Sequence, residues 1–211
     1  MIGSPAVTRP APPIPVMLKR RATKSGVAAV EAAWSVWSRG TEPRLVLSSR
    51  HGEFTRTFGL LSALADTDEV SPAEFSMSVH HALIGLLSIA TRNRSGHTAV
   101  GAGPESFGYG MIEALACLRH SRQPIIMLHF DEPPPQAYSS ILADDDRQAV
   151  ALLLSPAATA DGEAMSLALL PAADAEPLPK SMASTFVDFL TSRQPELNVT
   201  GNRSIWHWQR I

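Results

Sequence analysis

The segment HTAVGAGPESFGYGMIEALACLRH, residues 97–120, predicts a short buried strand, a tight glycine turn and a long helix. Gly101-Ala102-Gly103 forms the turn, because glycine reaches backbone conformations that other residues avoid. Pro104 suits the first helical position, where a missing N–H costs nothing, and Glu105 puts negative charge at the positive end of the helix. Such a turn often holds a nucleophile or binds an anion, but these residues carry no nucleophilic side chain.

The helix that follows the turn contains two glycines, Gly108 and Gly110. Glycine in a helix interior costs about 1 kcal/mol relative to alanine, so the pair predicts close packing against another backbone. Apolar residues recur along one side of the same helix at the helical period. They are Phe107, Met111, Ala114, Leu115 and Leu118.

The whole chain has 211 residues, which is enough for one domain with a substantial core. Its net charge of −2 gives no argument for binding nucleic acid, and its single cysteine excludes an internal disulfide. No apolar run reaches the roughly 18 residues of a membrane span, and the N-terminus lacks the pattern of a signal peptide. The sequence therefore predicts a cytoplasmic protein with no membrane span and no nucleic-acid partner.

Periodicity along the rest of the chain predicts strands that alternate with helices. Expected helices cover residues 23–37, 53–65, 79–91 and 181–192, and expected strands cover 44–49, 124–130, 149–154, 165–170 and 205–209. The third helix is apolar nearly all round and is therefore expected to be buried. The strands at 149–154 and 165–170 are expected to pair antiparallel through a turn at Asp161-Gly162. Together these elements predict an α/β fold with a mixed sheet.

Two segments are expected to lie outside the regular elements. Residues 1–22 are rich in proline and contain the Lys19-Arg20-Arg21 cluster, which predicts a basic arm, either flexible and extended or laid across a surface. Residues 171–180 are a linker rich in proline, alanine and acidic residues. Residues 23–211 are expected to form a single domain.

Several polar groups match the pattern of a functional site only in part. His80 and His81 are adjacent, so on a helix their side chains diverge by about 100° and cannot bind one metal ion. Asp144-Asp145-Asp146 lacks the glycine and the terminal glutamate of a calcium loop, and Ser106 stands where a dinucleotide fingerprint needs its third glycine. Cys117 lies far from the positive end of its helix and is expected to be inert, so the sequence predicts neither a metal nor a cofactor.

A family resemblance rests on motifs spread from about residue 16 to the end of the chain. They are LKRR at 18–21, SSRHGE at 48–53, SVHHALIGLLSI at 78–89, AGPESF at 102–107, EA at 113–114 and WHWQR at 206–210. In these motifs the chain resembles the short β-ketoacyl-synthase-like family of aryl-polyene and xanthomonadin-type pigment clusters, whose members act as chain-length factors. The family generally has asparagine where this chain has His81.

The resemblance implies half of a thiolase-like fold, with a five-stranded mixed sheet, helices on both faces and short C-terminal additions. In full ketosynthases the strand–turn–helix unit carries the nucleophilic cysteine at the start of the helix. Matching that motif to GAGPESF places the nucleophile position at Gly103, which cannot form a thioester. Full enzymes also take two histidines from a second half-domain, and no histidine of this chain matches the motifs that carry them. The resemblance thus implies that the chain is not an enzyme on its own.

The resemblance also implies a heterodimer with a full-length β-ketoacyl synthase, and an acyl carrier protein as a second candidate partner. The expected pairing edge, which would be a template for another chain, consists of Thr98, Ala99, Val100 and Gly101. The expected gate, which would close the acyl tunnel of the synthase and set product length, consists of Phe75, Met77, His80, His81, Phe107 and Met111.

Two other functions stay open on the sequence. A small acyltransferase or hydrolase would need a nucleophile at Ser106 or Ser88, with His80 or His81 as its base. A scaffold or regulator without a synthase partner is the third hypothesis. Co-purification with a ketosynthase in a one-to-one ratio would distinguish a chain-length factor from this third class, and acyl transfer lost in Ser106→Ala would indicate the enzyme.

Overall fold

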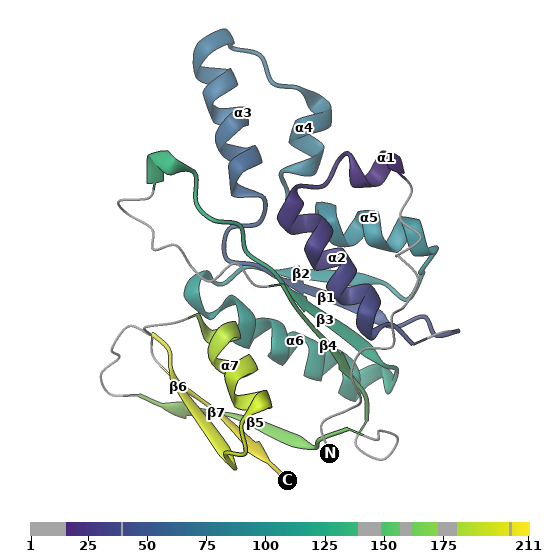
Figure 1. Cartoon of the computed structure of the whole chain (residues 1–211), viewed down its shortest axis with the longest axis vertical. Coiled ribbons are helices and arrows are strands. Elements are labelled where there is room, and N and C mark those ends of the chain that lie inside the picture. Colours follow the sequence, from purple (N-terminus) through teal and green to yellow (C-terminus); the bar gives the residue numbers. More distant parts are fainter. Residues whose placement is uncertain (1–15, 39, 139–148, 157–161, 173–180, 203) are drawn as a thin grey trace.

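The computed structural model describes residues 16–38, 40–138, 149–156, 162–172, 181–202 and 204–211 (Figure 1). Its strands are β1 (Arg44–Ser48), β2 (His97–Val100), β3 (Ile125–His129), β4 (Val150–Leu154), β5 (Met165–Pro171), β6 (Glu196–Thr200) and β7 (Ser204–Arg210). Its α-helices are α1 (Val16–Lys19), α2 (Lys24–Val36), α3 (Phe54–Thr67), α4 (Pro72–Met77), α5 (His81–Thr91), α6 (Ser106–Ser121) and α7 (Met182–Thr191). The Asp144-Asp145-Asp146 segment, most of the linker and most of the N-terminal arm lie outside the described residues.

The larger sheet has the strand order β2-β1-β3-β4. β1 is parallel to β2 and to β3, whereas β4 is antiparallel to β3. The two central strands are those predicted at 44–49 and 124–130, and every residue of β3 is buried. A continuous apolar run is typical of such a strand, because both of its faces are covered.

Helices cover both faces of this sheet, as the sequence predicted (Figure 1). Successive side chains of a strand point to opposite faces, which divides the core in two. Leu45 and Ile126 belong to the cluster beneath α2 and α5. Val46 and Met127 belong to the cluster that contains α6 and α7. The mixed α/β architecture with two covered faces is therefore confirmed.

A second sheet of three strands, in the order β5-β7-β6, shares the core cluster of α6 and α7. β5 pairs antiparallel with β7, and β4 pairs with β3. The prediction of a single five-stranded sheet and of an antiparallel pair between 149–154 and 165–170 was therefore wrong. Proximity along the chain favours a hairpin, but Trp206 and Trp208 of β7 are fully buried in the α6–α7 cluster, and β5 joins that strand. β6 was not predicted.

Helices α3 and α4 form a hairpin that stands away from the rest of the molecule (Figure 1). None of the residues of α3 is buried. The sequence analysis predicted no helix where α4 forms, although the start signals of a helix are present there. Ser71 caps α4 by accepting a hydrogen bond from the Glu74 N–H, and Pro72 occupies its first turn.

Helix α5 corresponds to the third predicted helix but is less buried than predicted. Leu83, Ile84 and Leu87 are buried against α2 and the sheet. Ile89, on the opposite side, is 71% exposed. The prediction that this helix is buried therefore holds for one face only within the single chain.

The part of the N-terminal arm that the structure describes is not wholly extended, because α1 forms one helical turn just before α2. Thr23 then caps α2 by accepting a hydrogen bond from the Gly26 N–H at 3.1 Å. Among the described helices, none is both long and apolar enough to cross a membrane.

Candidate functional site

The turn between β2 and α6 has the geometry expected of a catalytic elbow. Gly103 has a φ of +58°, a backbone conformation that glycine adopts without strain. Residues Gly103–Glu105 form a 3₁₀ turn, and α6 begins at Ser106. A Cβ at position 103 would meet no atom within 4 Å, so the space beside the bend is open. The position that the resemblance matches to the nucleophile is thus accessible but holds only a hydrogen atom.

Ser106 does not occupy that open position. Its hydroxyl donates a hydrogen bond to the Gly103 carbonyl at 2.7 Å and accepts one from the Ala102 N–H at 2.9 Å. The residue is almost fully buried, and both bonds close the turn on itself. The hydroxyl therefore stabilises the elbow and is not presented to a substrate or to a histidine.

Trp206 of the second sheet holds the elbow in place. Glu105 is buried, and its carboxylate accepts a hydrogen bond from Trp206 Nε1 at 2.7 Å. The aromatic ring of Trp206 also explains Gly108, because a Cβ there would lie 2.6 Å from the ring. Ser48 of β1 explains Gly110 in the same way, because a Cβ added at Gly110 would lie 2.6 Å from Ser48 Cβ. The predicted close packing is confirmed, but side chains rather than another backbone make the approach.

His80 lies between the ends of the two parallel strands β1 and β2. A Cβ on Gly52 would be 3.3 Å from His80 Cε1, and a Cβ on Gly101 would be 3.4 Å from its Nε2. Nε2 is buried and has no hydrogen-bond partner among the described residues. His80 thus fits between two glycine-containing turns at the edge of the sheet where α/β proteins place their ligand sites.

His81 points elsewhere, which agrees with the divergence predicted for adjacent helical residues. Its ring lies 5.3 Å from the ring of His97 at the start of β2. Burial, the nearby His81 and the charge of Arg44 lower the pKa of His97. Arg44 also donates a hydrogen bond to Thr98 Oγ1 at 2.9 Å, so three cationic or titratable groups surround the beginning of the edge strand.

A buried Ser–His–Asp constellation at the ends of β1 and β3 was missed by the sequence analysis. Ser48 Oγ lies 2.8 Å from His129 Nδ1, and His129 Nε2 lies 3.4 Å from Asp131 Oδ2. The signal that could have found it is positional. Ser48 and His129 are the last residues of two neighbouring parallel strands, Asp131 follows one of them, and the carboxyl ends of such strands meet at one edge of the sheet.

This constellation has a structural role in the described fold. Ser48 is fully buried beneath Gly110, so its hydroxyl is not accessible. The other oxygen of Asp131 accepts hydrogen bonds from the Ser49 hydroxyl and from the backbone N–H groups of Arg50 and His51. Burial acts to raise the pKa of Asp131, but these bonds and His129 outweigh it and lower the pKa. The ionised carboxylate therefore fixes the turn that supports His80.

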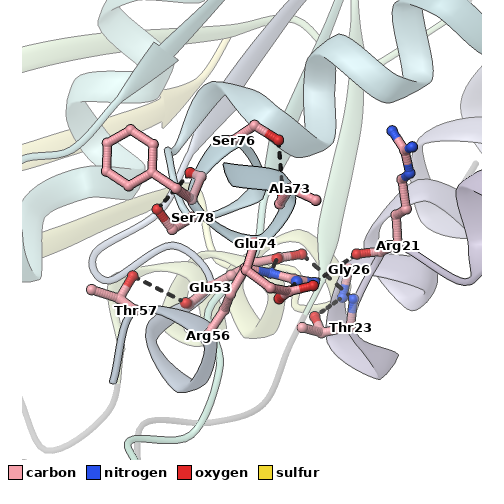
Figure 2. Close-up of polar contacts among 11 residues, drawn as sticks. Arg21, Thr23, Gly26, Glu53, Arg56, Thr57, Ala73, Glu74, Ser76 and Ser78 are labelled. Atoms are coloured by element: carbon pink, nitrogen blue, oxygen red, sulfur yellow. Dashed lines mark hydrogen bonds and ion pairs between the residues drawn. The ribbon is translucent and has the colours of Figure 1, made fainter. Parts of the chain in front are cut away.

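A second polar cluster anchors the α3–α4 hairpin (Figure 2). Arg56 donates to Glu53 Oε2 at 2.6 Å and to the Arg21 carbonyl at 2.6 Å, and it also forms an ion pair with Glu74. Figure 2 shows these groups converging from α3, α4 and the segment before α2. Nearby, burial and the charge of Glu53 raise the pKa of Glu132.

The structure separates the predicted gate residues into two groups. Phe107 and Met111 are buried in the core with α7, and Met77 is also buried. Phe75 is 61% exposed on the hairpin. Within the described residues, no group of three or more metal-binding side chains is present. Cys117 is half-buried, and burial together with Glu113 raises its pKa.

The predicted pairing strand, β2, lies at the edge of the larger sheet. The Leu45 N–H donates to the Gly96 carbonyl and the Ser49 N–H donates to the Val100 carbonyl. Alternate residues of a strand direct their backbone groups to opposite sides, so residues 96, 98 and 100 face β1. The backbone groups of His97 and Ala99 therefore point away from the sheet.

Comparisons with known proteins agree with this geometry. The family model for the N-terminal domain of β-ketoacyl synthases matches residues 3–209. A solved complex of the ketosynthase ApeO with its chain-length factor ApeC, from Xenorhabdus doucetiae, contains a chain that is 27% identical. The match has a TM-score of 0.80 and covers 98% of this chain and 84% of that one.

A second solved structure shares the fold alone, at 12% identity and a TM-score of 0.57, over 74% of this chain and 56% of that one. It is a type II polyketide acyl-carrier protein, AntF, in complex with its hexaketide-bound ketosynthase, AntDE. No curated protein matches the chain. The half-thiolase architecture and the match over nearly the full sequence show that this chain belongs to the β-ketoacyl synthase N-terminal-domain family.

Proposed function

We propose that this chain is a non-catalytic chain-length factor that pairs with a full-length β-ketoacyl synthase. The pathway would be a type II fatty-acid or polyketide-like synthesis of the aryl-polyene kind. The similar chain in the ApeO–ApeC structure comes from a ketosynthase–chain-length-factor complex, which supports this assignment. The observation that carries the proposal is Gly103, a residue without a side chain at an otherwise well-formed elbow.

The chemistry of condensation explains why this residue matters. An acyl group must be transferred to an activated nucleophile, usually a thiolate, before a new carbon–carbon bond forms. Gly103 offers no such atom, and the Ser106 hydroxyl is bound within the turn. Cys117 lies on the fourth turn of α6, and its raised pKa disfavours the thiolate. The nucleophile would therefore come from the partner.

Pairing would use the open edge of β2. The outward backbone groups of His97 and Ala99 can accept another strand, which would continue the sheet into the partner. Ala99→Pro removes one outward N–H without touching the hydrogen bonds to β1, whereas Ala99→Val keeps that N–H. The first variant should lose the partner and the second should retain it.

The decisive experiment is co-expression of the chain with each full-length β-ketoacyl synthase of the source organism. A chain-length factor should co-purify with one of them in a one-to-one ratio. Condensation by the pair should survive in this subunit's Ser106→Ala variant and disappear when the active-site cysteine of the synthase is replaced. Condensation or thioester hydrolysis by this chain alone, lost in Ser106→Ala, would instead support the acyltransferase or hydrolase hypothesis.

Product length would be set in part by Phe75, an exposed member of the proposed gate. Phe75→Ala should lengthen the products of the pair, because a bulky side chain near the synthase would be removed. Phe107→Ala, in the core, should lower the stability of the chain instead. Unchanged product lengths for Phe75→Ala and for substitutions at His80 and His81 would reject the gate.

A further inference from the structure

The outer face of α5 is apolar and uncovered. The helix reads HALIGLLSIAT and contains no Asp, Glu, Lys or Arg. Leu83, Ile84 and Leu87 face the core, which places Gly85 and Ile89 on the opposite side of the helix. A surface helix normally carries polar residues on that side, whereas a helix that is apolar all round is normally buried. The composition of α5 is therefore typical of a helix that is buried against protein on both faces.

The surroundings of Gly85 differ from those of the two glycines of α6. Gly108 and Gly110 of α6 are explained by Trp206 and Ser48, which leave no room for a Cβ. A Cβ on Gly85 would meet no atom within 4 Å. No contact of the described chain accounts for this glycine, but the close approach of another backbone would account for it.

The same face continues into the proposed pairing edge. α5 packs along β2, and the ring of His81 lies against that of His97 at the start of the strand. Val79, just before α5, is 49% exposed and adds to the apolar surface. The N-terminal end of α5 thus lies beside the start of β2, so a strand added to the open edge of β2 would lie next to α5.

We propose that a helix of the β-ketoacyl synthase partner crosses α5 at Gly85 and covers Ile89. This inference rests on the function proposed above and specifies what that partner must offer. A strand that adds to β2 would bring neighbouring elements of the same subunit over α5. Because α5 contains no Asp, Glu, Lys or Arg, the expected contact is apolar, as at the core of stable interfaces. The partner helix must therefore present small or apolar residues opposite Gly85.

Two substitutions test the contact, using the synthase that the wild-type chain retains. Ile89→Asp places a charge in the patch, and Gly85→Leu fills the space for the crossing helix. Each should weaken the complex at least tenfold, measured as the dissociation constant of the purified subunits. Leu170→Asp is the matched control, because Leu170 is 43% exposed on β5 of the second sheet and should leave the constant unchanged. Circular dichroism of each isolated variant checks that it folds.

Hydrogen–deuterium exchange of the wild-type chain gives a measurement that needs no variant. Amides of residues 81–91 should exchange more slowly in the complex than in the isolated chain. A stable complex with unchanged exchange in α5, or with unchanged dissociation constants for both variants, would overturn this inference and leave the proposed function intact. Failure of the wild-type chain to retain any synthase would overturn both.

Other possible coverings of the α5 face give distinct results. Self-association of the isolated chain that is lost in Ile89→Asp would identify a second copy as the occupant. Deletion of residues 1–15 that speeds exchange in α5 of the isolated chain would identify the chain's own N-terminal arm. Either result would contradict the assignment of this face to the synthase.

Discussion

At the scale of single residues, the glycines of this chain serve different purposes that the sequence does not distinguish. Gly103 is needed for its positive φ, Gly110 for the proximity of β1, and Gly85 for neither. We therefore expect substitution by alanine to change the stability of the chain differently at the three positions. Their behaviour would show which glycines are required by the internal fold.

Gly110→Ala should destabilise the chain by about 1–3 kcal/mol, the range for overpacking a core. The new Cβ would lie 2.6 Å from Ser48 Cβ and 2.9 Å from Met127 Cε, so β1 or α6 must shift. Denaturant unfolding monitored by circular dichroism measures the change. Gly85→Ala is the matched control and should raise stability by up to about 1 kcal/mol, because alanine favours helix and nothing obstructs it. Equal effects of the two changes would contradict this account.

Gly103→Ala should cost about 1 kcal/mol through backbone strain alone, since φ is +58° but the surrounding space is open. Asparagine tolerates this conformation better than alanine, so Gly103→Asn should cost less than Gly103→Ala. Comparison of the two unfolding free energies tests strain directly. A larger loss for asparagine, the bulkier residue, would instead indicate a steric cause.

Glu132→Gln should stabilise the chain at neutral pH. Burial, and then the charge of Glu53, raise the pKa of Glu132 above its ordinary value of 4.5, so the folded state favours the protonated form. The stabilising effect of that form is complete below the ordinary pKa and is lost as pH rises through the folded-state pKa. The melting temperature of Glu132→Gln should therefore exceed that of the wild type at pH 7 and approach it near pH 4. An identical difference at both values would exclude Glu132 as its source.

At the scale of elements, a polar cluster and a few aromatic contacts hold the α3–α4 hairpin. None of the residues of α3 is buried, and Arg56 connects the hairpin to Glu53, Glu74 and the segment before α2 (Figure 2). Phe54 and Phe58 of α3 also contact the ring of Tyr138, with ring centroids 5.0 and 5.8 Å apart. Hydrogen bonds and charge therefore contribute to the direction in which the hairpin presents Phe75.

Arg56→Met should leave the buried carboxylate of Glu53 without its cationic partner and destabilise the hairpin by about 1–3 kcal/mol. Hydrogen exchange should accelerate in residues 54–77, while the amides of β1 and β3 should keep their protection. Arg56→Lys, which retains the charge but not the planar fork, should give an intermediate result. Equal acceleration throughout the chain would mean that the hairpin and the sheet unfold together.

At the scale of the whole molecule, α6 connects the two sheets. Its residues pack on β1 and β3, and they share one core cluster with α7, β6 and β7. Trp206 spans this junction, since its ring lies against Gly108 and its Nε1 donates to Glu105 at the elbow. The second sheet is therefore part of the support of the candidate site.

The chain should unfold in one cooperative transition, because neither sheet can lose α6 and remain covered. Tryptophan fluorescence and far-ultraviolet circular dichroism should give the same midpoint. Trp206→Phe should lower both midpoints together, since it leaves the buried Glu105 carboxylate without its donor. Two separate transitions would show that the second sheet is an independent unit.

The sequence by itself determined the strand–turn–helix unit, the two buried central strands and the family, because these depend on periodicity and motifs among neighbouring residues. Only the tertiary structure decided that β5 pairs with β7, that Ser48, His129 and Asp131 meet, and that one face of α5 stays uncovered. Each of these depends on residues that are distant in sequence. Which of them meet is decided only when the whole chain folds and brings complementary surfaces together. An apolar helix requires a cover, but its sequence does not state whether its own chain or another supplies it.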